Sequence, residues 1–227
     1  MLEPFAPSLY LAEGPSVPFL GIPYPTRMAV AKLEDGSLWV WSPIALSPEL
    51  EREVNALGPV RHVVAPNKLH HLFLPEWAER FPDASFYAPP GLAKRKPQLH
   101  FDFELDGKAP SAWEGEIEQA LFKGSIAMEE VLFFHRPSRT AILCDLVQRH
   151  HAPDFKPIHR LLLWADGLLG KEGSTPREWR FTFWRRSQTR ASRSVVLNWK
   201  PENLIIAHGA CAKGQADEIL TRALAWV

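Results

Sequence analysis

The sequence predicts one α/β domain that contains two β-sheets. Between residues 47 and 88, strand-like and helix-like segments alternate, which is typical of parallel strands with helices packed outside them. Between residues 117 and 143, three strand-like runs follow one another closely, which favours antiparallel pairing in a second sheet. Histidine or aspartate follows several of these runs, so the strand ends are the candidate functional region.

The composition is that of an ordinary soluble domain. The chain has 227 residues, of which 46% are hydrophobic and 23% are charged. Basic and acidic residues number 26 each, so no overall field attracts nucleic acid or a membrane surface. Two cysteines, Cys144 and Cys211, form no disulfide framework, and no signal peptide or membrane-spanning segment is evident. A cytoplasmic location is therefore expected.

The first elements predicted are strands. Residues 8–12 form a short strand, and a proline-rich link follows over residues 15–25. Residues 27–33 and 38–41 are strand-like runs on either side of Asp35-Gly36, a strong hairpin signal. Both faces of the run over residues 38–41 are apolar, which indicates a central strand.

A helix is predicted to begin after Ser47. Serine is a favourable N-cap, Pro48 suits the first turn, and Gly58-Pro59 ends the apolar periodicity. The later elements are predicted from the same signals: strand 60–65, helix 75–81, strands 85–88, 117–122, 131–134 and 140–143, a mainly helical region 157–199, strand 204–207 and helix 216–227.

Three polar segments follow strand-like runs and carry most of the functional information. They are Asn67-Lys68-Leu69-His70-His71, the single residue Asp145, and His208-Gly209. Imidazole nitrogens and carboxylate oxygens are common ligands of zinc and of other divalent transition metals. The sequence therefore predicts a metal site built from strand ends.

The order of these segments resembles that of the metallo-β-lactamase superfamily. Residues 66–71 fall where that family has its His-x-His-x-Asp-His loop, Asp145 falls at its metal-bridging aspartate, and His208 falls at its final histidine. The resemblance spans roughly residues 8–225. It implies an αββα sandwich, in which two mixed sheets face each other with helices outside. It also implies one domain over residues 1–227, with a helical insertion at about residues 155–199.

The first metal position of that family lacks its histidines here. Pro66 and Lys68 stand where the two histidines of His-x-His would be. The resemblance therefore implies that the first metal is lost and that the Lys68 ammonium takes its place. Glu129 and Glu130 precede the strand-like run at 131, near the place of the family's third histidine. Either a carboxylate enters the site there or both residues lie at the surface.

The second metal position is better preserved. The resemblance implies that His70, His71, Asp145 and His208 hold one divalent metal ion, with zinc as the first candidate and iron or manganese as alternatives. If His70 is not a ligand, the other three leave an open position, as catalytic zinc sites do. The expected catalytic residues are Lys68, which stabilises negative charge, His70, a ligand or general base, and Asp145.

Each of these residues also has a purely structural explanation. His70 and His71 could cap the following helix, Asp145 could accept backbone N–H groups, and His208 could be a turn residue. A run of arginines and aromatic residues over 177–193 is either an anion platform or a helix with an aromatic core face.

Two functions remain open from the sequence. The first is a mononuclear metal-dependent hydrolase of a small molecule, with anionic or ester compounds as candidates. The second is a non-catalytic protein of the same fold, without metal, in which Lys68 pairs with Asp145 and the chain binds a ligand or partner. Neither involves nucleic acid or a membrane, and the sequence does not reveal the oligomeric state.

Overall fold

The computed structural model describes the chain except for residues 20–21 and 171–172. Among the described residues, the first sheet contains seven strands in the order β1-β2-β3-β4-β5-β6-β7. The strand bounds are β1 Leu2–Ala6, β2 Leu9–Phe19, β3 Ile22–Lys32, β4 Leu38–Trp41, β5 Val60–Val64, β6 Ser85–Ala88 and β7 Phe103–Glu104. Strands β1 to β4 pair antiparallel and β4 to β7 pair parallel, so the sheet is mixed.

The second sheet has five strands among the described residues, in the order β12-β11-β10-β9-β8. Their bounds are β8 Ile117–Phe122, β9 Glu130–His135, β10 Thr140–Leu143, β11 Asn203–Ile206 and β12 Ala212–Lys213. Strands β8, β9 and β10 form the antiparallel meander that their close spacing predicts. Strand β11 then pairs parallel to β10, which brings the ends of these two strands to one edge.

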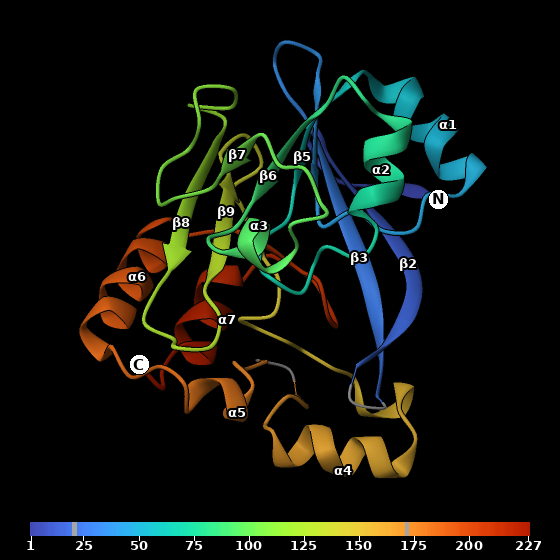
Figure 1. The fold of residues 1–227 in the computed structure, drawn as a ribbon. Helices are drawn as coiled ribbons and strands as arrows, with labels where there is room; N and C mark the ends of the chain where they lie inside the picture. The colour runs from blue at the N-terminus through green and yellow to red at the C-terminus, as the bar shows by residue number, and fades with distance from the viewer. Residues whose placement is uncertain (20–21, 171–172) are drawn as a thin grey trace.

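The helices lie outside the two sheets (Figure 1). Their bounds are α1 Pro48–Leu57, α2 Leu74–Arg80, α3 Leu92–Arg95, α4 Pro157–Ala165, α5 Arg177–Arg180, α6 Arg186–Asn198 and α7 Ala216–Ala223, with a 3-10 turn at Ala152–Asp154. Helix α1 begins as predicted, because the Ser47 hydroxyl accepts a hydrogen bond from the Leu50 amide and Pro48 occupies the first turn.

Alternating residues of the strands divide the core into three apolar layers. Side chains such as Trp39, Trp41 and Phe133 fill the space between the two sheets. Met28 and Val40 point the other way and pack beneath α1 and α2. The opposite face of the second sheet packs against α6 and α7. This arrangement is the predicted αββα sandwich with mixed sheets.

The predicted proline-rich link at residues 15–25 is wrong for its described part. Strands β2 and β3 continue through it as a hairpin, with Val17 opposite Tyr24 and Pro18 opposite Pro23. Proline lacks an amide hydrogen, but it is tolerated in strands where no ladder hydrogen bond is needed. Residues 20 and 21 lie outside the described residues. Strand β1 was not predicted either.

The region 157–199 is helical in three separate pieces, and residues 171–172 within it are not described. Helix α6 packs against β8 and forms part of the outer layer. Trp179 and Phe183 are buried, as expected for an aromatic core face, whereas Phe181 and Trp184 are exposed. Helix α4 lies apart from both sheets (Figure 1), with Ile158, Leu161 and Trp164 exposed.

Candidate metal centre

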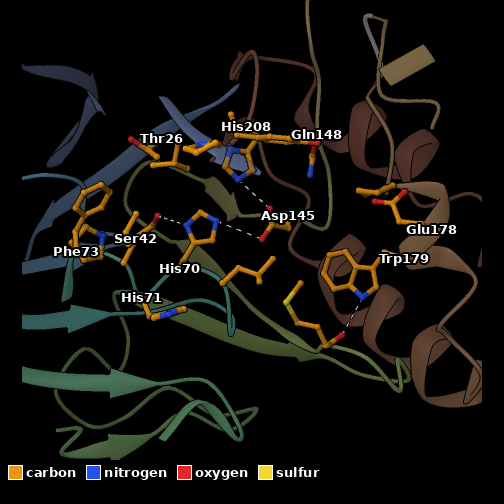
Figure 2. A pocket seen from close by; sticks show the side chains of 18 residues that line it. Thr26, Ser42, His70, His71, Phe73, Asp145, Gln148, Glu178, Trp179 and His208 are labelled. Atoms are coloured by element: carbon orange, nitrogen blue, oxygen red, sulfur yellow. Dashed lines mark hydrogen bonds and ion pairs between the residues drawn. The ribbon is translucent and has the colours of Figure 1, made fainter. Parts of the chain in front are cut away.

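Loops from both sheets meet at one end of the sandwich. His70 follows β5 of the first sheet, whereas Asp145 and His208 each come two residues after the parallel strands β10 and β11 of the second. Figure 2 shows the rings of His70 and His208 directed at the Asp145 carboxylate. The structure therefore brings together three of the four ligands that the sequence predicted.

The two imidazoles contact different oxygens of the carboxylate. Nε2 of His208 lies 3.1 Å from Oδ1 of Asp145, and Nε2 of His70 lies 3.5 Å from Oδ2. The side chains are 7%, 13% and 10% exposed for His208, His70 and Asp145, respectively. These polar atoms therefore depend on one another, or on a bound ion, because little water reaches them.

The second nitrogen of each ring is held by the protein. Nδ1 of His208 lies 2.9 Å from the carbonyl oxygen of Pro25. A carbonyl oxygen only accepts hydrogen bonds, so Nδ1 carries the proton and donates. In a neutral His208 ring, Nε2 is then unprotonated, and its lone pair faces Asp145. Nδ1 of His70 lies 2.8 Å from the Ser42 hydroxyl, which can either donate or accept.

The two histidine–aspartate pairs are spaced as ligands of a divalent metal ion are. Two acceptor atoms that face each other at 3.1 Å require a proton or a cation between them. Ligand atoms around a tetrahedral zinc ion, at bond lengths of about 2.0–2.2 Å, are themselves roughly 3.3 Å apart. The observed separations of 3.1 and 3.5 Å lie on either side of that value. Among the described residues, the group of possible ligands whose atoms all lie within 4.8 Å of one another consists of His70, Cys144 and Asp145 and does not include His208.

The buried side chains of Asn67 and Glu130 hold Asp145 and the turn that carries it. The Asn67 side chain donates to Oδ2 of Asp145 at 2.7 Å and to Oε2 of Glu130 at 3.0 Å. Glu130 is fully buried and accepts hydrogen bonds from the backbone amides of Cys144, Asp145 and Leu146. Glu130 is therefore neither a surface residue nor a member of the metal-ligand cluster, but the support of the turn that carries Asp145.

The pKa values of Asp145 and Glu130 shift in opposite directions. Burial on its own would raise the pKa of Asp145, but the charge and hydrogen bonds of His70 and His208 outweigh it and hold this pKa well below its usual range. Burial and the neighbouring Asp145 raise the pKa of Glu130, although the N–H groups that donate to it oppose the rise. Of the two groups, Asp145 is the one whose ionised form is stabilised by its neighbours.

Two predicted site residues lie away from the Asp145 carboxylate. His71 lines the same cavity, but its ring is set apart from Asp145 in Figure 2, and its buried Nδ1 has no hydrogen-bond partner among the described residues. Lys68 is not among the described residues that line the cavity, and a Cβ on Gly91 would lie 3.2 Å from its Nζ. No ion pair joins Lys68 to Asp145 in the described part of the chain.

Sequence reasoning missed Ser42 and the carbonyl of Pro25, which orient the two imidazoles. A signal for Ser42 was available, because it directly follows β4, and β4 pairs parallel with β5. The carboxyl ends of neighbouring parallel strands lie at the same end of a sheet, so Ser42 could be expected close to the loop after β5. No sequence pattern marks a backbone carbonyl as a partner of His208.

The site forms the floor of a cavity of about 550 Å³. Its other polar lining residues include Thr26, Gln148 and Glu178, and Trp179 faces the histidines from the opposite wall (Figure 2). A cavity with a few convergent polar groups on its floor is the usual form of a small-molecule site.

Comparison with known proteins agrees with this architecture. The family model described as a domain of unknown function, DUF4336, matches residues 17–160. The solved DIM-1 metallo-β-lactamase is 13% identical, covers 99% of this chain and 96% of its own, and gives a TM-score of 0.67. The mono-zinc form of metallo-β-lactamase FIM-1 from Pseudomonas aeruginosa is 9% identical, with 99% and 94% covered and a TM-score of 0.64.

A metallo-β-lactamase from Pontibacter korlensis is 13% identical, with 100% of this chain and 97% of that chain covered and a TM-score of 0.62. At these identities the similarity establishes the metallo-β-lactamase fold over the whole chain. No curated protein matches the sequence. Among the described residues, no helix has the length and apolar character needed to cross a membrane.

Proposed function

We propose a function for this chain, which belongs to the DUF4336 family and has the metallo-β-lactamase fold: hydrolysis of a small molecule with the help of one divalent metal ion. The observation that carries the proposal is the convergence of two imidazoles on one ionised carboxylate at the floor of a cavity. The mono-zinc form of FIM-1 offers a precedent for one metal in this fold.

The proposed ligands are Nε2 of His70, the Asp145 carboxylate and Nε2 of His208. His208 is oriented for this role, because its Nδ1 proton is committed to the Pro25 carbonyl and its Nε2 lone pair faces the carboxylate. Asn67 fixes the rotation of the carboxylate from the other side. His71 remains a candidate only if its ring turns toward the site. Zinc is the first candidate, and iron or manganese are alternatives.

When bound, a divalent metal ion supplies Lewis acidity and lowers the pKa of a coordinated water molecule toward neutrality. The protein residues perform the remaining tasks. Ser42 holds the His70 ring through Nδ1 and can exchange a proton with it. The low exposure of the three ligand side chains limits the water that competes with the substrate.

The competing arrangement contains a proton instead of a metal. A protonated His208 would form an ion pair with Asp145 across the same 3.1 Å. The cavity would then bind a ligand without catalysing a reaction. Metal content and turnover distinguish the two. We also propose a cytoplasmic location, which the two free cysteines support.

The proposal is tested with zinc-loaded protein and a panel of chromogenic carboxylic esters, thioesters, lactones and phosphodiesters. We expect turnover of at least one class, reduced by about a hundredfold or more in Asp145→Asn, because the variant keeps the shape of the side chain but loses its charge. Asp154→Asn is the matched control, since Asp154 is an exposed acid that does not line this cavity. Metal binding without turnover of any class would contradict the hydrolase proposal.

A further inference from the structure

The wall of the cavity is mostly apolar. Its apolar residues come from the β2 end, the loops after β4 and β5, and the segments before β9 and around α5: Val17, Pro18, Pro43, Leu69, Leu72, Phe73, Met128, Pro176 and Trp179. Leu72 is 60% exposed at this wall, although apolar surface in water is unfavourable. An apolar wall above a polar floor is suited to a ligand that has one reactive polar group and an apolar body.

Hydrogen bonds hold the aromatic part of the apolar wall in one orientation. The indole N–H of Trp179 donates to the Ser125 hydroxyl and to the Met128 carbonyl, each at 3.2 Å. These bonds fix the plane of the ring, which stands opposite His70 and Asp145 (Figure 2). A fixed aromatic surface binds a flat apolar group at low entropic cost, because little has to be ordered when the ligand arrives.

The charges around the cavity disfavour an anion. Its described lining contains the acids Asp145 and Glu178 but neither lysine nor arginine. The nearby arginines are directed elsewhere: Arg177 donates to the Ala165 carbonyl, and Arg180 donates to the Thr175 carbonyl and lies over the Trp226 ring. An anionic group would therefore lose its hydration without gaining a cationic side chain in return.

We infer that the cavity selects a small molecule that has a bulky apolar group and no negative charge. This assignment replaces the anionic candidate raised from the sequence. It rests on the proposed function for the statement that such a molecule is hydrolysed, but the binding preference depends only on the cavity walls. The two claims can therefore fail separately.

Three probes with the same aromatic body test the inference: 2-naphthylmethanol, 2-naphthylmethylammonium and naphthalene-2-sulfonate. Their affinities for the full chain are measured by isothermal titration calorimetry, with zinc and after removal of metal by a chelator. In the metal-free protein, we expect the neutral and cationic probes to bind at least about tenfold more tightly than the sulfonate; the zinc-loaded protein serves for comparison, because the ion itself attracts an anion. Equal or tighter binding of the sulfonate to the metal-free protein, or no binding of any probe, would overturn the inference.

A pair of lysine variants makes the test independent of the probe series. Leu72→Lys introduces a cation at the cavity wall and should tighten sulfonate binding by about fivefold or more while weakening the neutral probe. Leu161→Lys is the matched control, because Leu161 is similarly exposed, at 57% against 60%, but does not line the cavity. The same response in both variants, or none in Leu72→Lys, would contradict the assignment.

These outcomes are separable from those of the hydrolase test. If no substrate is turned over but the order of probe affinities holds, the binding preference stands and the hydrolase proposal falls. If the zinc-loaded protein turns over a substrate but the metal-free protein binds the sulfonate as tightly as the neutral probe, the hydrolase proposal stands and the binding preference falls.

Discussion

Glu130 shows how much of the site depends on a residue that is not a metal ligand. Both of its oxygens accept backbone N–H groups of the turn after β10, and its Oε2 also accepts from Asn67. In Glu130→Gln, the side-chain amide would face one of these N–H donors in either orientation. Because the raised pKa of about 8 leaves Glu130 largely uncharged at neutral pH, we expect the variant to lose about 1–3 kcal/mol in its free energy of unfolding, measured by urea denaturation.

The adjacent glutamate is the control for this prediction. Glu129 is partly exposed and accepts one amide hydrogen bond, from Gly124 at 3.2 Å. Glu129→Gln should therefore cost about 1 kcal/mol or less. A Glu130→Gln variant as stable as Glu129→Gln would show that the buried Glu130 side chain does not support the Asp145 turn.

His135 is predicted to make the stability of the protein depend on pH. It is fully buried on β9, and burial lowers its pKa to about 4. The unfolded chain takes up a proton below about pH 6.5, whereas the folded chain does so only near 4. The neutral His135 ring therefore contributes its full stabilisation above about pH 6.5. As the pH falls toward 4, the free energy of unfolding decreases by up to about 3 kcal/mol.

The measurement is urea denaturation of wild type and His135→Asn between pH 7.5 and about 4.5, the range in which this group separates the two states. The free energy of unfolding should fall less steeply in the variant. His100→Asn, at an exposed histidine, should keep the slope of the wild type. Parallel slopes for wild type and His135→Asn would exclude His135 as the origin of the effect.

At the scale of single residues, the sequence indicated which side chains meet at the site more successfully than it indicated how each side chain is oriented. Asp145 and His208 converge as predicted, because each follows one of two adjacent strand ends. The neighbours His70 and His71 could not be told apart, since loop backbone angles decide which ring faces the site. Lys68 was expected at the site because of the family resemblance alone, and the fold directs its ammonium toward Gly91 instead.

Among the elements, the turn after β11 is tightly constrained. Gly209 has a φ of +103°, and a Cβ there would lie 2.1 Å from the Arg149 carbonyl oxygen. Arg27 of β3 donates to the Gly209 carbonyl at 2.7 Å, beside the Pro25 carbonyl that holds His208. The turn is thus fastened to the first sheet at the point where His208 is presented.

We therefore predict that Gly209→Ala displaces His208 and lowers both stability and metal affinity. Gly214→Ala is the matched control, because Gly214 also has a positive φ, of +73°, but a Cβ there meets nothing within 4 Å. The control should lose about 1 kcal/mol, and Gly209→Ala about 3 kcal/mol or more, by thermal or urea unfolding. Equal losses would mean that the close approach of Arg149 is relieved without cost.

The sequence predicted most elements within a few residues of their bounds, because hydrophobic periodicity and turn residues are local signals. The hairpin of β2 and β3 is the exception. Its prolines at 15, 18, 23 and 25 indicated a link, but pairing with an adjacent strand is a tertiary property that local propensity does not report. The short strands β1, β7 and β12 escaped prediction for the same reason.

At the scale of the whole molecule, the proposed site joins the two halves of the sandwich. His70 belongs to a loop of the first sheet, and Asp145 and His208 belong to loops of the second. The facing of the two sheets could be predicted only through the family resemblance, because the apolar faces of both sheets look alike in sequence. A metal ion bound at this junction would stabilise the folded chain by an amount that grows with the logarithm of the metal concentration above its Kd.

Metal content measured by elemental mass spectrometry tests the central claim most directly. Wild type, His208→Gln and His151→Gln are purified without a histidine-rich tag and reconstituted with zinc, iron or manganese. The structure predicts close to one ion per chain in wild type and in His151→Gln, whose side chain is 72% exposed, and almost none in folded His208→Gln. A metal-free wild type after reconstitution, or equal metal in all three proteins, would contradict a metal site at Asp145.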